Sequence, residues 1–180
     1  MKSFAEEMSF YSAYHQEKRN VLIHVVGVPL ISFSLLVVMS WVPLFTFNGF
    51  TLTLATAFTV AVLIYYFMLD AIFATAAAVL FGSLLVAAHY VGAMGYTVGL
   101  TIFVVAQLFG WGTQFYGHFV FEKGRPALFD NLFQALFSAP LFVVADVFFE
   151  LGLRKDIEEQ VKDQLRAQGK LRVEPGQSMA

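Results

Sequence analysis

The sequence predicts an all-α integral membrane protein, a helical bundle of four to five apolar helices that follows an amino-terminal surface helix. Hydrophobic residues make up 58% of the 180 residues and charged residues 13%, against about 45–50% and about 25% in average proteins. From Val21 to Phe121 the only charged side chain is that of Asp70. A segment of this length and composition avoids water only in a lipid bilayer.

The composition also excludes several classes of function. A net charge of −2 and a pI near 6.0 provide no basic surface for nucleic acid. The chain has no cysteine, which excludes a disulfide framework, an iron–sulfur cluster, a thiolate zinc site and a thiol nucleophile. The polar residues 1–20 argue against a cleaved signal peptide.

Residues 3–19 are predicted to form an amphipathic helix at the membrane surface. Ser3 and Glu6 have the spacing of a capping box, which satisfies backbone N–H groups at a helix start. Apolar and aromatic positions three or four residues apart share one face of this helix. These positions are Phe4, Met8, Tyr11 and His15.

Four apolar segments follow, each near the length that a bilayer crossing requires. We expect a polar break after the first segment, Asp70 between the second and third, and a glycine kink within the fourth. The segments are residues 21–44, 52–69, 71–94 and 98–121, with the break at 46–49 and the kink at 110–112.

A last apolar segment, residues 132–153, precedes a polar surface helix over 154–168. The tail carries six Lys and Arg residues, which a fifth full crossing would place outside the cell. We therefore expect 132–153 to form a re-entrant or interfacial hairpin bent at Pro140. The domain organisation is then a membrane-embedded catalytic domain, 1–153, and a polar carboxy-terminal helix and tail, 154–180.

The positions of basic residues predict the orientation. Lys18 and Arg19 precede the first span, whereas Lys123 and Arg125 follow the fourth. By the positive-inside rule, the amino terminus and the loop at 122–130 face the cytoplasm, with an even number of crossings between them.

The histidines are the candidates for chemistry, because ionisable groups in a membrane segment are costly and usually functional. They are His15, His24, His89 and His118. With four crossings, His24 and His118 lie at one depth, and a turn at Asn20 would fold His15 over the same place. Glu122 lies one helical turn after His118. Three imidazoles and a carboxylate at one membrane face are typical of a metal site.

Other interpretations of the histidines remain open. A start of the third span at Ala71 places His89 about 27 Å away, near the opposite side, unless segments tilt or do not cross. Two histidines on neighbouring spans could ligate a b-type haem. Histidines that relay protons or tie helices together would indicate a transport or structural protein.

Two motifs resemble a known family. Residues 11–29, which include His15 and His24, and residues 111–128, which include His118, are similar to signatures of the Fe(II)-dependent 2-hydroxy fatty acid dioxygenases. These are small multi-pass membrane proteins of fatty acid α-oxidation in sphingoid-base degradation. Two positions depart from the pattern: Gly124 lies where a second basic residue or a shortened loop is expected, and Asp146 where a glutamate is expected.

The resemblance implies oxidation of a 2-hydroxy long-chain fatty acid by O₂ to the acid one carbon shorter, without 2-oxoglutarate. It implies Fe(II) as cofactor, the lipid bilayer as surroundings, and a bacterial inner membrane or an endoplasmic reticulum location. It leaves the oligomeric state open. The iron ligands it implies are His15, His24, His118 and, on weaker flanking similarity, His89.

Four further residues are assigned by their chemistry. Glu122 and Gln114 are the candidate catalytic residues, and Gln114, one helical turn before His118, would orient a ligand. Arg125 or Lys123 could pair with the substrate carboxylate, Arg125 in bidentate geometry. Both basic residues could equally act as membrane anchors.

Overall fold

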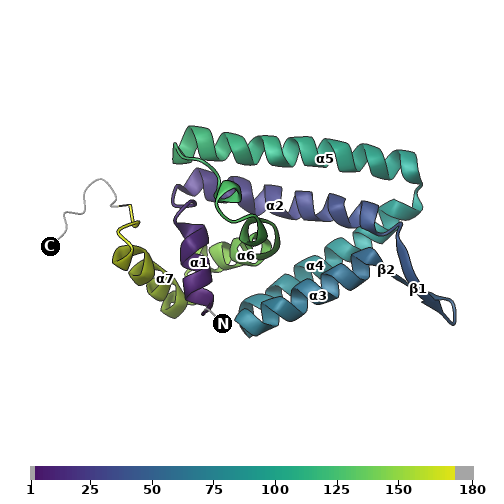
Figure 1. Ribbon diagram of the computed structural model, residues 1–180, viewed down its shortest axis with the longest axis horizontal. Helices are drawn as coiled ribbons and strands as arrows, with labels where there is room; N and C mark the ends of the chain where they lie inside the picture. The colour runs from purple at the N-terminus through teal and green to yellow at the C-terminus, as the bar shows by residue number, and fades with distance from the viewer. Residues whose placement is uncertain (1–2, 173–180) are drawn as a thin grey trace.

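The computed structural model describes residues 3–172 as a helical bundle with one small β-hairpin (Figure 1). Helices α2 and α5 lie side by side along the molecule, and α4 of the α3–α4 pair packs against α2. The predicted all-α bundle is confirmed. The elements are α1 (Phe4–Ser12), α2 (Lys18–Met39), β1 (Pro43–Phe47), β2 (Phe50–Thr53), α3 (Leu54–Leu69), α4 (Ala71–Ala93), α5 (Tyr96–Tyr116), η1 (Gly117–Glu122), η2 (Ala127–Phe129), η3 (Gln134–Ser138), α6 (Ala139–Glu150) and α7 (Lys155–Ala167).

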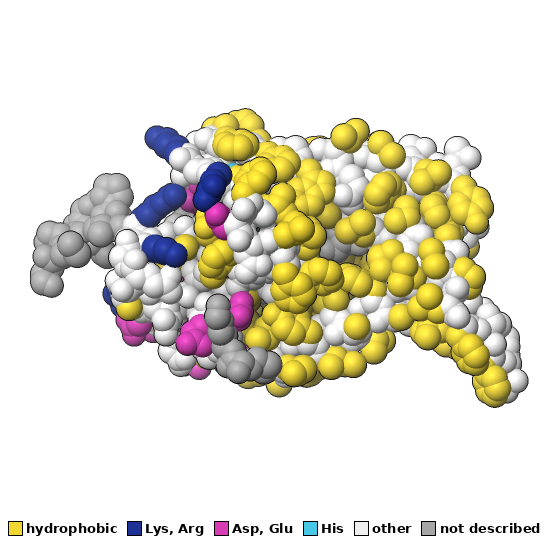
Figure 2. All heavy atoms as spheres, viewed as in Figure 1, with side chains coloured by type: hydrophobic (Ala, Val, Ile, Leu, Met, Phe, Trp, Pro, Cys, Tyr) yellow, Lys and Arg dark blue, Asp and Glu magenta, His cyan; other side chains and the backbone are white. Residues whose placement is uncertain are grey.

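The distribution of side chains fits a membrane protein. Three helices are long and apolar enough to cross a bilayer, namely α2, α4 and the continuous helix formed by α5 and η1. Helix α3 is apolar but has only 16 residues, about 24 Å of helix, so the second predicted span is shorter than a hydrocarbon core of about 30 Å. Hydrophobic side chains cover the body of the bundle, and charged side chains gather at the end that holds α1, α6 and α7 (Figures 1 and 2).

The first predicted helix is shorter than expected. The capping box between Ser3 and Glu6 is present, but α1 ends at Ser12 instead of residue 19. The chain turns within residues 13–17, which we call the connector, and not at Asn20. The reason is that the Glu17 side chain accepts hydrogen bonds from the first amides of α2 and so begins a new helix there.

The first span also ends earlier than predicted. Helix α2 stops at Met39, and the following residues form an antiparallel hairpin that begins at Pro43. Asn48 and Gly49, both with positive φ, form its tight turn. An Asn-Gly pair adopts this conformation at little cost, which favours a two-residue hairpin. The predicted polar break is therefore the tip of a hairpin that projects from the bundle (Figure 1).

Two predicted bends lie elsewhere in the structure. Helix α5 continues without interruption through Gly110–Gly112, and its irregular part is the π-helix η1. Pro140 does not bend the last apolar segment: it follows the π-helix η3 directly, and one helix runs through it from Leu136 to Glu150. The chain bends by 113° after α6, between Glu150 and Lys155.

Glycines on α5 allow its close approach to α2. A Cβ atom added at Gly110 would lie 2.6 Å from Ile31 Cγ1, and one at Gly117 would collide with Asn20 Oδ1. Small residues at a helix interface let backbones approach in this way. The contact fixes the end of α5 beside the start of α2.

Asp70 joins α3 to α4 and binds the polar end of the chain. Its side chain caps α4 through the amides of Ile72 and Phe73, and Arg154 donates to both of its oxygens at 3.2 and 3.1 Å. Partial burial alone would raise the pKa of Asp70, but the Arg154 and backbone hydrogen bonds outweigh burial and lower it. The charged end of the bundle thus includes the α3–α4 turn.

Helix α7 packs against α1 and belongs to the same core. Val161 and Leu165 of α7 are buried in one cluster with Phe4 and Met8 of α1. The predicted surface helix is therefore part of the bundle over its described residues, and the rest of the predicted tail, residues 173–180, lies outside them.

Candidate metal centre

Three histidines from three segments converge at the charged end of the bundle. His15 comes from the connector, His24 from the second turn of α2 and His118 from η1. Their ring centroids are 4.4, 4.8 and 4.9 Å apart, and each pair of rings meets edge to face. One nitrogen from each ring lies within 4.8 Å of the other two, so small rotations of the rings could direct all three toward one point.

Backbone hydrogen bonds fix two of these rings. His15 Nδ1 lies 2.8 Å from the carbonyl oxygen of Tyr11, and His24 Nδ1 lies 2.9 Å from that of Asn20. A carbonyl oxygen can only accept, so Nδ1 carries the proton in both rings, and Nε2 keeps its lone pair. A hydrogen bond of this kind orients a histidine that binds a metal.

The same rings leave nitrogens without partners in the interior. His15, His24 and His118 are 7%, 3% and 3% exposed. Neither His15 Nε2 nor His118 Nδ1 has a hydrogen-bond partner among the described residues. Burial, followed by the proximity of the other two histidines, lowers the pKa of His15 well below its ordinary value. The cluster therefore presents neutral nitrogen donors, as a divalent metal requires.

Tyr11 completes the wall of the cluster. Its ring stacks on that of His15, with the centroids 3.9 Å apart. Its buried hydroxyl lies beside the buried Asp146 carboxyl group of α6 without a well-aligned hydrogen bond to it. Burial, followed by the proximity of the Asp146 carboxyl group, raises the pKa of Tyr11 well above its ordinary value, so the phenol keeps its proton.

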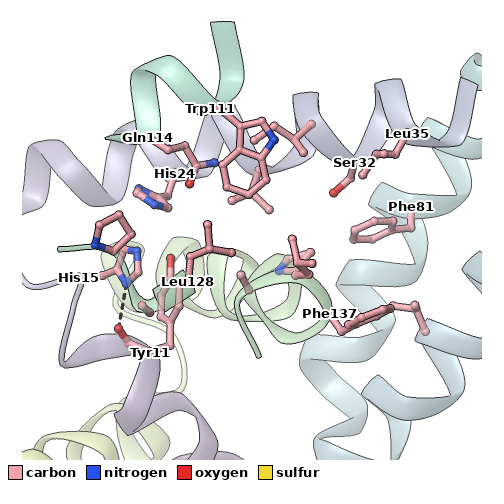
Figure 3. A pocket seen from close by; sticks show the side chains of 18 of the residues that line it. Tyr11, His15, His24, Ser32, Leu35, Phe81, Trp111, Gln114, Leu128 and Phe137 are labelled. Atoms are coloured by element: carbon pink, nitrogen blue, oxygen red, sulfur yellow. Dashed lines mark hydrogen bonds between the residues drawn. The ribbon is translucent and has the colours of Figure 1, made fainter. Parts of the chain in front are cut away.

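An apolar cavity of about 310 Å³ extends from the histidines into the bundle. Figure 3 shows His15, His24 and Gln114 at one end and Phe81 and Phe137 toward the other. Along α2 its wall runs from His24 to Met39, about 22 Å at the helical rise. A polar group at the histidines and a long apolar chain behind it would match this cavity.

Gln114 lies beside His24 at the polar end of the cavity (Figure 3). Gly27 provides the space for its amide, because a Cβ atom there would lie 3.1 Å from Gln114 Nε2. The pair Gly27 and Gln114 therefore belongs to the contact between α2 and α5, and the sequence did not indicate the role of Gly27.

Comparison with known proteins identifies the family. Residues 1–151 match the family model described as 2-hydroxy-palmitic acid dioxygenase Mpo1-like. The chain belongs to this family. It is 34% identical over 161 residues to the 2-hydroxy-palmitic acid dioxygenase MPO1 of Saccharomyces cerevisiae, which covers 88% of this chain and 87% of the yeast protein. No solved structure matches the chain.

In this Mpo1-like chain, Glu122 does not face the three ring nitrogens as a fourth ligand would. Its Oε1 accepts the backbone amides of Gln16 and Glu17, each at 2.7 Å, and the Asn20 amide at 3.3 Å. Its Oε2 forms an ion pair of 2.6 Å with Arg172. Glu122 thus holds the connector at Gln16, the residue that follows His15 in the chain.

The predicted basic residues lie outside the cavity of this family member. Neither Arg125 nor Lys123 lines it. Arg125 pairs with Asp130 at 2.6 Å, and Asp130 also accepts a hydrogen bond of 2.8 Å from Tyr14. Arg125 is therefore engaged in a loop contact at the surface.

The structure does not bring His89 to the other three histidines. His89 lies near the end of α4, where Nε2 is 3.0 Å from Thr53 Oγ1 and Nδ1 is 3.0 Å from the Leu85 carbonyl. Both ring nitrogens have protein partners, which is the arrangement of a structural histidine. The distance of about 27 Å along the helix from Ala71 to His89 predicted that His89 lies away from the other histidines. The family resemblance suggested instead that it is a fourth ligand.

Proposed function

We propose that this chain is a non-haem Fe(II)-dependent dioxygenase that converts a 2-hydroxy long-chain fatty acid to the acid one carbon shorter. The observation that carries the proposal is the set of three buried, neutral imidazoles at the polar end of an apolar cavity. Family membership supports the class of reaction, since the yeast relative is named as a 2-hydroxy-palmitic acid dioxygenase.

The donor set suits the proposed metal. Imidazole is a good ligand for iron, and sites with few protein ligands leave coordination positions for other reactants. Bound there, Fe(II) would supply Lewis acidity and a means of activating O₂. The mutual closeness of the rings disfavours a haem, because no pair of them leaves room for a porphyrin ring between its members.

The cavity separates the two ends of the proposed substrate. The acyl chain would lie along α2 among side chains such as Val28, Ile31 and Leu35, which are about as apolar as the lipid chains of the bilayer. The 2-hydroxy carboxylate would then reach the histidines. The wall there adds the hydroxyl of Tyr11 and the amide of Gln114, which can donate hydrogen bonds to its oxygens.

The overall reaction balances with O₂ as the sole oxidant. One molecule of O₂ and one hydroxy acid give the shorter carboxylic acid, carbon dioxide and water. The bond between the carboxyl carbon and the carbon that bears the hydroxyl breaks, and the latter carbon becomes the new carboxyl group. The apolar cavity walls would exclude water from the acyl chain. The polar groups of the substrate would lie near the three histidines.

The proposed orientation places the cluster at the cytoplasmic side. The connector, the end of η1 and α7 lie together at the charged end of the molecule (Figure 1), and the basic residues of this end favour the cytoplasm. With crossings by α2, α3, α4 and α5, a fatty acid dissolved in the bilayer would enter the cavity from the hydrocarbon region.

A product assay tests this function. The purified protein, loaded with Fe(II) under air, is given 2-hydroxypalmitate, and the fatty acids are analysed by mass spectrometry. We expect pentadecanoic acid, formed with consumption of O₂, and loss of this product when a chelator removes the metal. Iron-loaded protein that consumes no O₂ with any 2-hydroxy acid of this length would refute the proposal.

A further inference from the structure

We propose that residues 168–172, which follow α7 and which we call the strap, hold the connector in place and thereby position His15. Arg172 and Gln16 are the positioning residues in this arrangement. The proposal rests on the proposed function in that it takes the three-histidine cluster as the metal site. It concerns a part of the chain beyond the family match, which ends at residue 151.

Glu122 is the first link between the strap and the cluster. Its carboxylate gathers the amides of Gln16 and Glu17, both at 2.7 Å, immediately after His15 in the chain. It also receives the Asn20 side chain at 3.3 Å, and the Asn20 carbonyl holds the ring of His24. One carboxylate on η1 thus fixes the segments that carry two of the three histidines.

Arg172 is the cation that balances this carboxylate. The Glu122 side chain is only 2% exposed, and a buried carboxylate is costly unless it is paired. Arg172 Nη1 lies 2.6 Å from Glu122 Oε2, and Nη2 donates to the Glu122 backbone carbonyl at 3.0 Å. The guanidinium therefore holds both the side chain and the backbone of Glu122, which a lysine could not do in the same geometry.

Gln16 joins the connector to the strap directly. Its Nε2 donates to the Lys170 carbonyl at 2.9 Å, and its Oε1 accepts the Arg172 amide at 2.8 Å. The side-chain amide therefore pairs with the strap backbone as a neighbouring strand would. Leu171 packs on the main core, so the strap is also anchored through apolar contact.

Tyr11 holds the His15 ring from the preceding helix, and the strap supports the residues that follow His15. His24 and His118 belong to long helices packed on one another, whereas His15 lies in a short connector outside regular structure. Without Arg172, Glu122 would keep an unbalanced buried charge and would hold the connector amides less firmly. The His15 ring would keep its contacts with Tyr11, but the backbone that follows it would lose its fixed position. Loss of contacts that support a metal ligand typically weakens metal binding about 10–100-fold.

Arg172→Ala tests the strap in the full-length protein. Arg166→Ala is the matched control, because Arg166 is a half-exposed arginine of α7 that pairs with Asp163. We expect the Kd for Fe(II), measured by competition with a chelator, to rise at least about tenfold in Arg172→Ala and to stay unchanged in Arg166→Ala. Arg172→Lys should give an intermediate Kd, because it keeps the ion pair with the Glu122 carboxylate and loses the hydrogen bond to the Glu122 carbonyl.

Hydrogen exchange in the metal-free protein provides a measurement that does not depend on the proposed function. The amides of Gln16 and Glu17 should exchange faster in Arg172→Ala than in the wild type, while those of α2 keep their protection. Unchanged exchange at these two amides would overturn the strap. A wild-type protein that binds Fe(II) but oxidises no 2-hydroxy acid would overturn the proposed function and leave the strap intact.

Discussion

The ring of Tyr11 lies parallel to the ring of His15, with 3.9 Å between centroids and 12° between planes. The carbonyl of Tyr11 also holds His15 Nδ1. One residue thus orients a proposed metal ligand through both its backbone and its side chain. The residue lines the cavity, and its buried hydroxyl lies beside the Asp146 carboxyl group.

Tyr11→Phe should separate these roles. The variant keeps the stacking and the backbone contact, so bound iron and melting temperature should match the wild type. Loss of a hydrogen bond to a charged ligand costs about 1.5–3 kcal/mol, so we expect the KM for 2-hydroxypalmitate to rise at least about tenfold. Tyr14→Phe, which loses a surface hydrogen bond to Asp130, is the control. An unchanged KM in Tyr11→Phe would show that the hydroxyl does not touch the substrate.

Gly117→Ala should disrupt the contact between α5 and α2. A Cβ atom there would displace the Asn20 side chain, which binds Glu122. Overpacking of this kind typically costs about 1–3 kcal/mol, so the melting temperature and the bound iron should both fall. Gly112→Ala, on the same helix with open space around its Cβ position, should retain both. Equal stability of the two variants would contradict the packing described for η1.

The Asp70–Arg154 pair should contribute stability that depends on pH. The pKa of Asp70 is lowered in the folded protein, so the contribution is complete above the unfolded value of about 3.9. It is lost as pH falls through the lower, folded pKa. Asp70→Asn keeps an N-cap residue but removes the charge, and should cost roughly 1–3 kcal/mol at pH 6.

Thermal unfolding in detergent at several pH values checks this prediction. The difference in melting temperature between wild type and Asp70→Asn should persist from pH 7 to about pH 4 and vanish at lower pH. Asp156→Asn, which removes an exposed partner of Arg154, should have little effect at any pH. If the difference in melting temperature between wild type and Asp70→Asn grew as pH falls, the pKa of Asp70 would be raised on folding, which would contradict the ion pair with Arg154.

Local patterns in the sequence predicted much of the fold. The capping box at Ser3, the break at Asp70 and the long apolar segments depend on neighbouring residues. The structure confirms the first two and three of the four predicted spans. The predictions that were wrong concerned where elements end. The connector starts after Ser12 because Glu17 caps the next helix. At Pro140 the helix continues from η3 into α6 instead of bending.

The sequence also predicted which histidines meet, through the depth that the crossings assign to each of them. It could not predict the contacts that support them. Glu122 lies 106 residues from Gln16, and Arg172 lies 50 residues beyond Glu122. Such pairs are set by how α1, η1 and the strap pack together, and no local pattern distinguishes Arg172 from other basic residues of the tail. The unpaired hydroxyl of Tyr11 likewise becomes visible only in the packed structure.

The iron content of single histidine variants tests the central claim most directly. Wild type, His15→Ala, His24→Ala, His118→Ala and His89→Ala are purified in one detergent, loaded with Fe(II) and analysed for iron per chain. We predict about one iron in the wild type and in His89→Ala, and little or none in the other three variants, with unchanged membrane insertion. Full iron content in any of those three, or its loss only in His89→Ala, would contradict the proposed metal centre.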